Sequence, residues 1–93
     1  MIKINEYFHG TVKSLGVENT AGKATVGVMD VGEYEFGTAA PEKMTLITGT
    51  WEIKLPGETS FQSYAKSITV HVPGNSKFQL KVTEQSAYLC EFV

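Results

Sequence analysis

The sequence contains no arginine. All eight of its cationic residues are lysines, and with ten acidic residues they give a formal net charge of −2. Without guanidinium groups, an anion cannot be gripped by a bidentate fork and must be held by lysine, backbone N–H groups or hydroxyls. An acidic balance also lacks the basic footprint of nucleic-acid-binding proteins. We therefore expect no nucleic-acid partner.

Cysteine and long apolar runs are also scarce. Cys90 is the single cysteine, which excludes an intrachain disulfide and fits a reducing compartment. No segment approaches the roughly 20 apolar residues that span a bilayer. The residues from Met1 to Glu6 lack the apolar run of a signal peptide. These absences predict a cytoplasmic protein without a membrane partner.

Metal-ligating side chains are few and widely spaced. His9 and His71 lie far apart in the sequence, and Cys90 has no second cysteine beside it. A zinc site usually takes its ligands at short spacing. We expect no metal and no other cofactor, although three sequence-distant ligands meeting in space stays an open alternative.

The length sets the domain count. A chain of 93 residues is long enough for one domain, because two cores would each be too small to be stable. Apolar residues make up 42% of the chain and charged residues 19%, as in globular proteins. We expect a single domain over residues 1–93. Because such a core is small, we also expect a homodimer.

Apolar and polar residues alternate with period two along most of the chain. This pattern predicts strands with one buried face, separated by turns rich in Gly, Pro and Asn. The alternating runs lie at 23–29, 33–38, 51–55, 68–72 and 77–82, and a further run includes Tyr88, Cys90 and Phe92. A short helix near 83–87 remains possible. Strands at short, regular spacing indicate an all-β sandwich or small barrel.

Two short motifs resemble those of cupins, which are jelly-roll β-barrels. Residues Glu42–Gly49 have the Glu-x₆-Gly form that closes the first cupin motif, and Val72-Pro73-Gly74 resembles the Pro-x-Gly of the second. Metal-binding cupins place histidines at positions that here hold Phe36, Thr38 and Lys77. The resemblance therefore implies an all-β, single-domain cupin fold without a metal.

A longer series of matches covers essentially the whole chain. It consists of Asn5-Glu6-Tyr7-Phe8, Val26-Gly27-Val28-Met29, Gly32-Glu33-Tyr34, Phe36, Thr38, Pro41-Glu42, Met44-Thr45, Gly49, Val72-Pro73-Gly74 and Ser86-x-Tyr88-Leu89-Cys90. In this order and spacing the chain resembles the small cupin-type pyrimidine/purine nucleoside phosphorylases. The resemblance implies a cytosolic, dimeric enzyme that converts many ribonucleosides and inorganic phosphate to free base and ribose 1-phosphate. Ser67 and Lys77 depart from the pattern of this family.

Strand parity suggests roles for several residues of such an enzyme. We interpret Glu42 as the catalytic group, acting on a ribose hydroxyl or on the cationic sugar. Phe36, Thr38 and Tyr88 are candidates for the walls of the substrate-binding lumen, where stacking would suit a wide range of bases. Lys77 and Gln79 are candidates for binding phosphate, provided that they point inward.

Each assignment has a structural alternative. Phe36 can be ordinary core, Glu42 a solvated carboxylate, and Lys77 a surface cation, because the residues alternating with it are the apolar ones. Cys90 lies in an apolar run and is expected to be a buried, inert thiol. A non-catalytic small-molecule-binding cupin therefore remains an alternative, and so does a metal-free sugar epimerase. The epimerase would need a His-Asp pair, and the sole aspartate is Asp30, in a turn.

Overall fold

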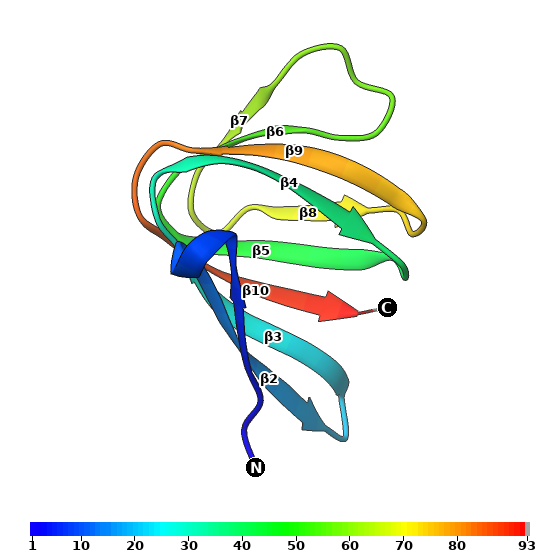
Figure 1. Ribbon diagram of the computed structural model, residues 1–93. Helices are drawn as coiled ribbons and strands as arrows, with labels where there is room; N and C mark the ends of the chain where they lie inside the picture. The colour runs from blue at the N-terminus through cyan, green and yellow to red at the C-terminus, as the bar shows by residue number, and fades with distance from the viewer. Residues whose placement is uncertain (93) are drawn as a thin grey trace.

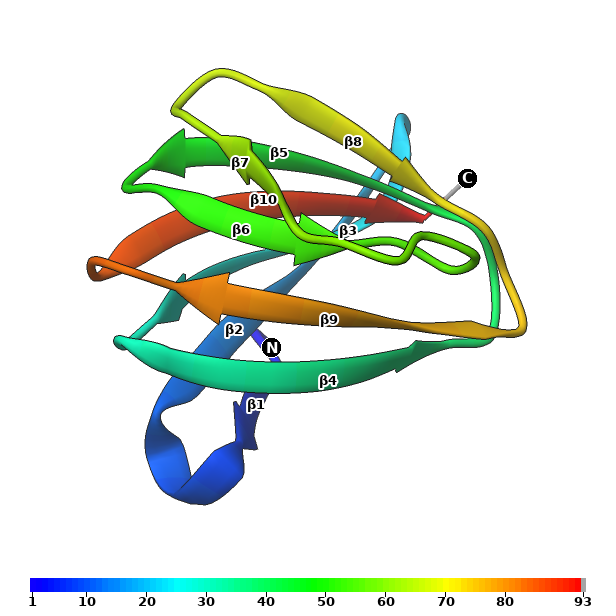
Figure 2. The same cartoon turned by 90° about the horizontal axis from the view of Figure 1, so that it is seen from above.

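The computed structural model describes residues 1–92, which form two antiparallel β-sheets facing each other (Figure 1). The larger sheet contains, in spatial order, β1 (Ile4–Tyr7), β2 (Val12–Asn19), β3 (Gly22–Met29), β10 (Ser86–Phe92), β5 (Glu42–Thr48) and β8 (Thr69–Val72). The smaller contains β4 (Gly32–Thr38), β9 (Ser76–Val82), β6 (Trp51–Lys54) and β7 (Gln62–Tyr64), side by side in Figure 2. A single 3-10 turn, Phe8–Gly10, links β1 to β2.

The predicted strands are confirmed, and alternation explains their orientation. In β9, Phe78, Leu80 and Val82 are buried, whereas the residues between them face outward. The five expected runs each match a strand to within one residue at either end. Residues 83–85 form a bend that leads into β10, so the short helix left open there does not form.

The core lies between the two sheets. Its largest fully buried side chains are Trp51, Phe78, Ile53 and Leu80 from the smaller sheet and Met29, Leu46 and Val12 from the larger. Burying each such side chain contributes about 1.5–3 kcal/mol. These residues belong to one continuous cluster. The two sheets are therefore held together by a shared apolar layer.

The outer face of the larger sheet is unusually apolar for a solvent-facing surface. Leu15 and Val26 are cross-strand neighbours, and Leu89 lies next to Val26 on β10. Val17 and Val28 extend the same face, and all of these except Leu89 are exposed. We call these five residues the outer apolar face. Among residues 1–92, no helix is long and apolar enough to cross a membrane.

Candidate active site

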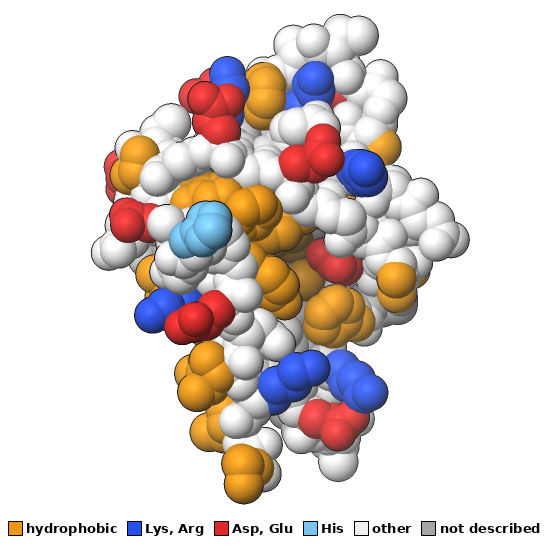
Figure 3. All heavy atoms as spheres, viewed as in Figure 1, with side chains coloured by type: hydrophobic (Ala, Val, Ile, Leu, Met, Phe, Trp, Pro, Cys, Tyr) orange, Lys and Arg blue, Asp and Glu red, His pale blue; other side chains and the backbone are white. Residues whose placement is uncertain are grey.

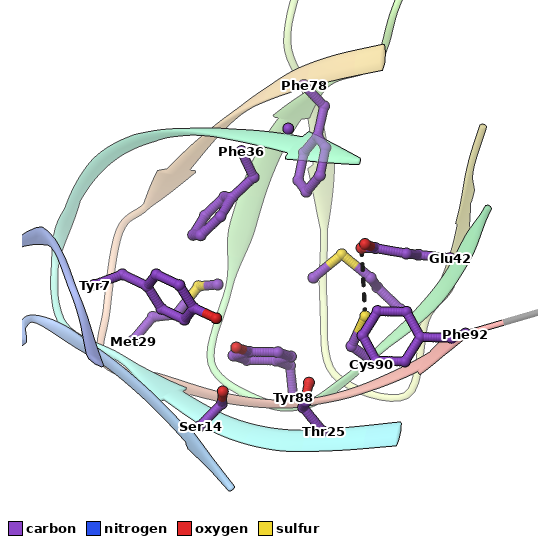
Figure 4. A pocket seen from close by; sticks show the side chains of 12 residues that line it. Tyr7, Ser14, Thr25, Met29, Phe36, Glu42, Phe78, Tyr88, Cys90 and Phe92 are labelled. Atoms are coloured by element: carbon purple, nitrogen blue, oxygen red, sulfur yellow. Dashed lines mark hydrogen bonds between the residues drawn. The ribbon is translucent and has the colours of Figure 1, made fainter. Parts of the chain in front are cut away.

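A cavity of about 220 Å³ opens between the two sheets. In Figure 3 a hollow framed by hydrophobic side chains occupies the middle of the molecular face, and Figure 4 shows its lining residues. Its aromatic residues are Tyr7, Phe36, Phe78, Tyr88 and Phe92, and its other polar side chains are Ser14, Thr25, Glu42 and Cys90. The cavity therefore combines flat aromatic surface with a few hydroxyls, one thiol and one carboxyl.

The register of the larger sheet places Tyr88 in the floor of this cavity. Asn5, Ser14, Gly27 and Tyr88 are successive cross-strand partners on β1, β2, β3 and β10. A Cβ atom on Gly27 would lie 2.5 Å from the Tyr88 ring and its hydroxyl oxygen. Because glycine leaves this space free, the Tyr88 ring lies across β3 and extends toward Ser14.

Glu42 and Cys90, on the adjacent strands β5 and β10, form another side of the cavity. Cys90 lies between Thr25 and Met44, and Glu42 begins β5 opposite Phe92. The Cys90 thiol donates a hydrogen bond to Glu42 Oε1 over 3.4 Å. Figure 4 shows this pair on one side of the cavity, with Tyr7 and Phe36 on the other and Tyr88 below.

Burial determines the electrostatics of the pair. Loss of solvent raises the pKa of the Glu42 carboxyl, and the hydrogen bond from Cys90 lowers it by a smaller amount. Burial, followed by the nearby charge of Glu42, raises the pKa of the Cys90 thiol to about 12. Because a thiol is nucleophilic only as the thiolate, Cys90 is a neutral hydrogen-bond donor here and no nucleophile. Its predicted burial is confirmed.

Tyr88 is also held in its neutral form. Burial is the largest cause that raises the pKa of its phenol to about 12, and the nearby Ser14 hydroxyl opposes the rise. A neutral phenol can donate its proton to a hydrogen-bond acceptor in the cavity.

Three of the residues singled out from the sequence meet in the cavity. Glu42, Phe36 and Tyr88 all line it. Phe36 stacks on Phe78 with ring centroids 5.7 Å apart. Tyr34 packs against Phe36 behind this wall, and its hydroxyl donates to the Asp30 carbonyl.

Thr38 does not line the cavity, and its predicted place in the lumen wall needs correction. Its hydroxyl donates to the Pro73 carbonyl over 2.6 Å and accepts from the Ser76 N–H over 3.2 Å. Both partners belong to the segment that enters β9. Thr38 faces inward as expected, but at the end of β4 this side chain fastens the strand to the adjacent turn.

Lys77 and Gln79 lie on the opposite side of the smaller sheet from the cavity. Strand parity requires this, because Phe78 and Leu80 are the buried residues of β9. Gln79 Nε2 donates to Glu35 Oε2 over 2.8 Å on the outer surface, and Lys77 is exposed. The condition set for a phosphate-binding role, that both point inward, is therefore not met.

Several cavity residues were not identified from the sequence. Tyr7 lies in the short strand β1, which the alternation pattern did not predict, and Ser14 and Thr25 lie in strands interrupted by Gly16 and Gly27. The sequence gives no signal for Ser14, because its face of the strand, with Val12 and Gly16, is no more apolar than the face of Lys13, Leu15 and Val17. No group of three or more His, Cys, Asp or Glu residues in the described part of the chain could hold a metal ion.

Comparisons with known proteins match nearly the whole length of the chain to one family. A family model described as "Pyrimidine/purine nucleoside phosphorylase" matches residues 2–92. A protein of that name from Pseudomonas aeruginosa is 55% identical over 92 residues, which cover 99% of each chain. A protein from Tolumonas auensis with the same name is 54% identical over the same share.

Solved structures with a similar fold include a close sequence relative and a distant cupin domain. A Vibrio parahaemolyticus protein described as of unknown function has a TM-score of 0.96 and 46% identity, covering 100% of this chain and 99% of that one. A Schizosaccharomyces pombe cupin domain, 14% identical, has a TM-score of 0.69 over 98% of this chain and 69% of that one, which supports the cupin fold alone. The chain therefore belongs to the pyrimidine/purine nucleoside phosphorylase family.

Proposed function

We propose that the cavity between the sheets is the active site of a broad-specificity nucleoside phosphorylase. The enzyme converts purine and pyrimidine ribonucleosides and inorganic phosphate to free base and ribose 1-phosphate. The observation that carries the assignment of the site is the half-buried Glu42 carboxyl facing an aromatic cavity. Full-length family membership supports the reaction.

The reaction balances without any further reactant. A phosphate oxygen bonds to C1′ as the C1′–N bond breaks, and the electron pair of that bond stays with the base. The base takes up one proton and hydrogenphosphate gives one up. The site must therefore position phosphate, tolerate positive charge on the sugar and deliver a proton to the base.

Glu42 is suited to the proton transfer. Burial raises the pKa of its carboxyl, so a larger fraction carries a proton near neutral pH than in a solvated glutamate. The Cys90 thiol holds Oε1. The second carboxyl oxygen is free to protonate the departing base and is reprotonated by the proton that phosphate gives up.

The aromatic walls account for tolerance of different bases. Phe36 and Phe78 present a stacked pair at the top of the cavity. Stacking contributes about 1–3 kcal/mol per base and is available to purines and pyrimidines alike. A wall with many fixed hydrogen-bonding groups would reject bases that leave those groups unpaired.

The alternative function is non-catalytic binding of a nucleoside or sugar. It is favoured by one observation: among the lining residues, Glu42 is the single carboxyl and no lysine or histidine accompanies it. Uridine and adenosine should be incubated separately with the protein, with and without phosphate. Phosphate-dependent release of both bases supports the enzyme, whereas tight binding of folded protein without release of either base supports the alternative.

The protein is further proposed to act as a cytoplasmic homodimer, with the outer apolar faces of two copies packed together. This face is bordered by the ion pairs Glu6–Lys13 and Lys43–Glu91, so a two-fold partner meets both signs of charge. Solvent exposure of such a face is unfavourable for a small domain.

Light scattering tests the dimer. The wild type should have twice the chain mass at micromolar concentration, and Val26→Lys should give the monomer. Val31→Lys, which changes an exposed apolar residue in the turn after β3, is the matched control and should remain dimeric. A monomeric wild type contradicts the proposal.

A further inference from the structure

Phosphate must be bound in a cavity that offers it no cation. None of the residues that line the cavity within residues 1–92 is lysine, arginine or histidine. Lys77, the cation that the sequence suggested, lies on the other side of the smaller sheet. The remaining donors for an anion are neutral hydroxyls and backbone N–H groups.

Three hydroxyls of the cavity gather at one place. The Ser14 hydroxyl and the Tyr7 phenol both lie close enough to the Tyr88 phenol to affect its pKa. Figure 4 shows the oxygen atoms of Tyr7 and Tyr88 directed toward each other, with Ser14 below them. Ser14 is 3% exposed, and Asn5 Nδ2 donates to its Oγ over 3.3 Å.

We propose that the hydroxyls of Tyr7, Ser14 and Tyr88 form the binding site for inorganic phosphate. The inference rests on the proposed function and assigns its second substrate to a defined part of the cavity. A phosphate oxygen accepts a hydrogen bond from each phenol. Because Ser14 can accept from Asn5 while its own proton points into the cavity, the serine supplies a third donor.

The proposed phosphate site and Glu42 lie on different sides of the cavity, as attack on one side of the sugar and departure of the base on the other require. The Tyr88 ring lies over β3 toward β2, whereas Glu42 belongs to β5, on the other side of β10. Phosphate bound at the hydroxyls is thus kept away from a carboxylate that would repel it. A ribosyl group between the two sites would meet phosphate from one side while its base departs toward Glu42.

Gly27 is the positioning residue of the site. Its missing side chain leaves the space that the Tyr88 ring fills, since an added Cβ would come within 2.5 Å of three ring and hydroxyl atoms. The backbone permits an alanine at this position, because Gly27 is not among the glycines with positive φ. Gly27→Ala therefore moves the phenol and leaves its chemistry unchanged.

The test measures KM for phosphate and for uridine in matched variants. Removing one hydrogen bond to a charged ligand predicts a rise in the phosphate KM of roughly ten- to a hundredfold for Tyr88→Phe, with the uridine KM within about threefold. Tyr7→Phe should change the same constant in the same direction. Tyr64→Phe, on β7 outside the cavity, is the control and should match the wild type.

Gly27→Ala should reproduce the effect of Tyr88→Phe on the phosphate KM. Gly16→Ala on β2 is its control, because a Cβ there meets Lys3 at an ordinary 3.6 Å. Circular dichroism and Tm report whether each variant folds. If Gly27→Ala does not fold, the test rests on Tyr88→Phe.

The outcomes separate this inference from the proposed function. A wild type that releases no base in phosphate contradicts the proposed function itself. An active wild type whose phosphate KM is unchanged in both Tyr88→Phe and Tyr7→Phe overturns the hydroxyl site. Equal rises in the uridine and phosphate KM values also overturn it, because they indicate general damage to the cavity.

Discussion

Replacing Glu42 with glutamine keeps the shape of the side chain and removes its acidic proton. In the wild type, Cys90 Sγ lies 3.4 Å from Glu42 Oε1. The amide oxygen of glutamine can still accept this hydrogen bond, so the packing of the cavity is retained. A general acid contributes about 10²–10⁴-fold to a rate. We therefore expect kcat to fall by about this factor, which corresponds to roughly 3–5 kcal/mol of barrier, with both KM values changing little.

The same substitution has a signed effect on stability. Burial raises the pKa of Glu42 in the folded protein above the value of 4.5 for a solvated glutamate. The fold therefore binds this proton more tightly than the unfolded chain does. Its stabilising contribution is complete at pH below 4.5 and decreases as the pH rises through the raised folded-state pKa. Glutamine cannot ionise, so the Tm of Glu42→Gln relative to wild type should increase from acidic to neutral pH.

The assay quantifies ribose 1-phosphate from uridine at saturating phosphate, alongside thermal melts from acidic to neutral pH. Glu91→Gln is the matched control, because Glu91 lies on the outer face of β10, paired with Lys43, and does not line the cavity. A folded Glu42→Gln variant with wild-type kcat would refute the catalytic assignment. A Tm difference that decreases toward neutral pH would refute the electrostatic reasoning.

Three further predictions follow from the contacts of the site. Thr38→Val should lower stability by about 1–3 kcal/mol in a denaturant titration, because the Ser76 N–H loses its acceptor and the Pro73 carbonyl keeps only the Ser76 hydroxyl of its two donors. The uridine KM should be unchanged, and a changed KM at unchanged stability would return Thr38 to the substrate site. Cys90→Ala should move the pH–rate profile toward higher pH than Cys90→Ser, because the thiol hydrogen bond lowers the pKa of Glu42; superimposable profiles contradict this. Dialysis against a chelator should leave kcat unchanged, and activity that is lost and then restored by one metal would contradict the expectation of a metal-free enzyme.

The fold follows from the sequence wherever alternation is unbroken. Strand β9 was placed nearly to the residue because Phe78, Leu80 and Val82 alternate with polar residues. Strand β2 was missed. Its inner face holds Val12, Ser14 and Gly16, and its outer face holds exposed apolar residues, so the usual contrast between the faces is absent. The apolar pattern reports burial, and this strand has apolar residues on its solvent side.

The site was predictable only in part, because it depends on register between strands. The motif position of Glu42 and the parity of Phe36 and Tyr88 were enough to place these residues in the lumen. The hydroxyl cluster was not visible, since Ser14 and Tyr88 are joined across Gly27 by pairings over long sequence separations. Period-two alternation assigns a residue to a face of a strand and says nothing about which strand lies beside it.

The central claim, that phosphate rather than water attacks C1′ of a nucleoside in this protein, is tested most directly by following oxygen from phosphate into the sugar product. Uridine should be incubated with the protein and phosphate that carries ¹⁸O at every oxygen, and the product analysed by mass spectrometry. The account predicts ribose 1-phosphate that retains all four heavy oxygens, including the one bonded to C1′. Free ribose as the sugar product, formed at the same rate whether or not phosphate is present, would contradict it.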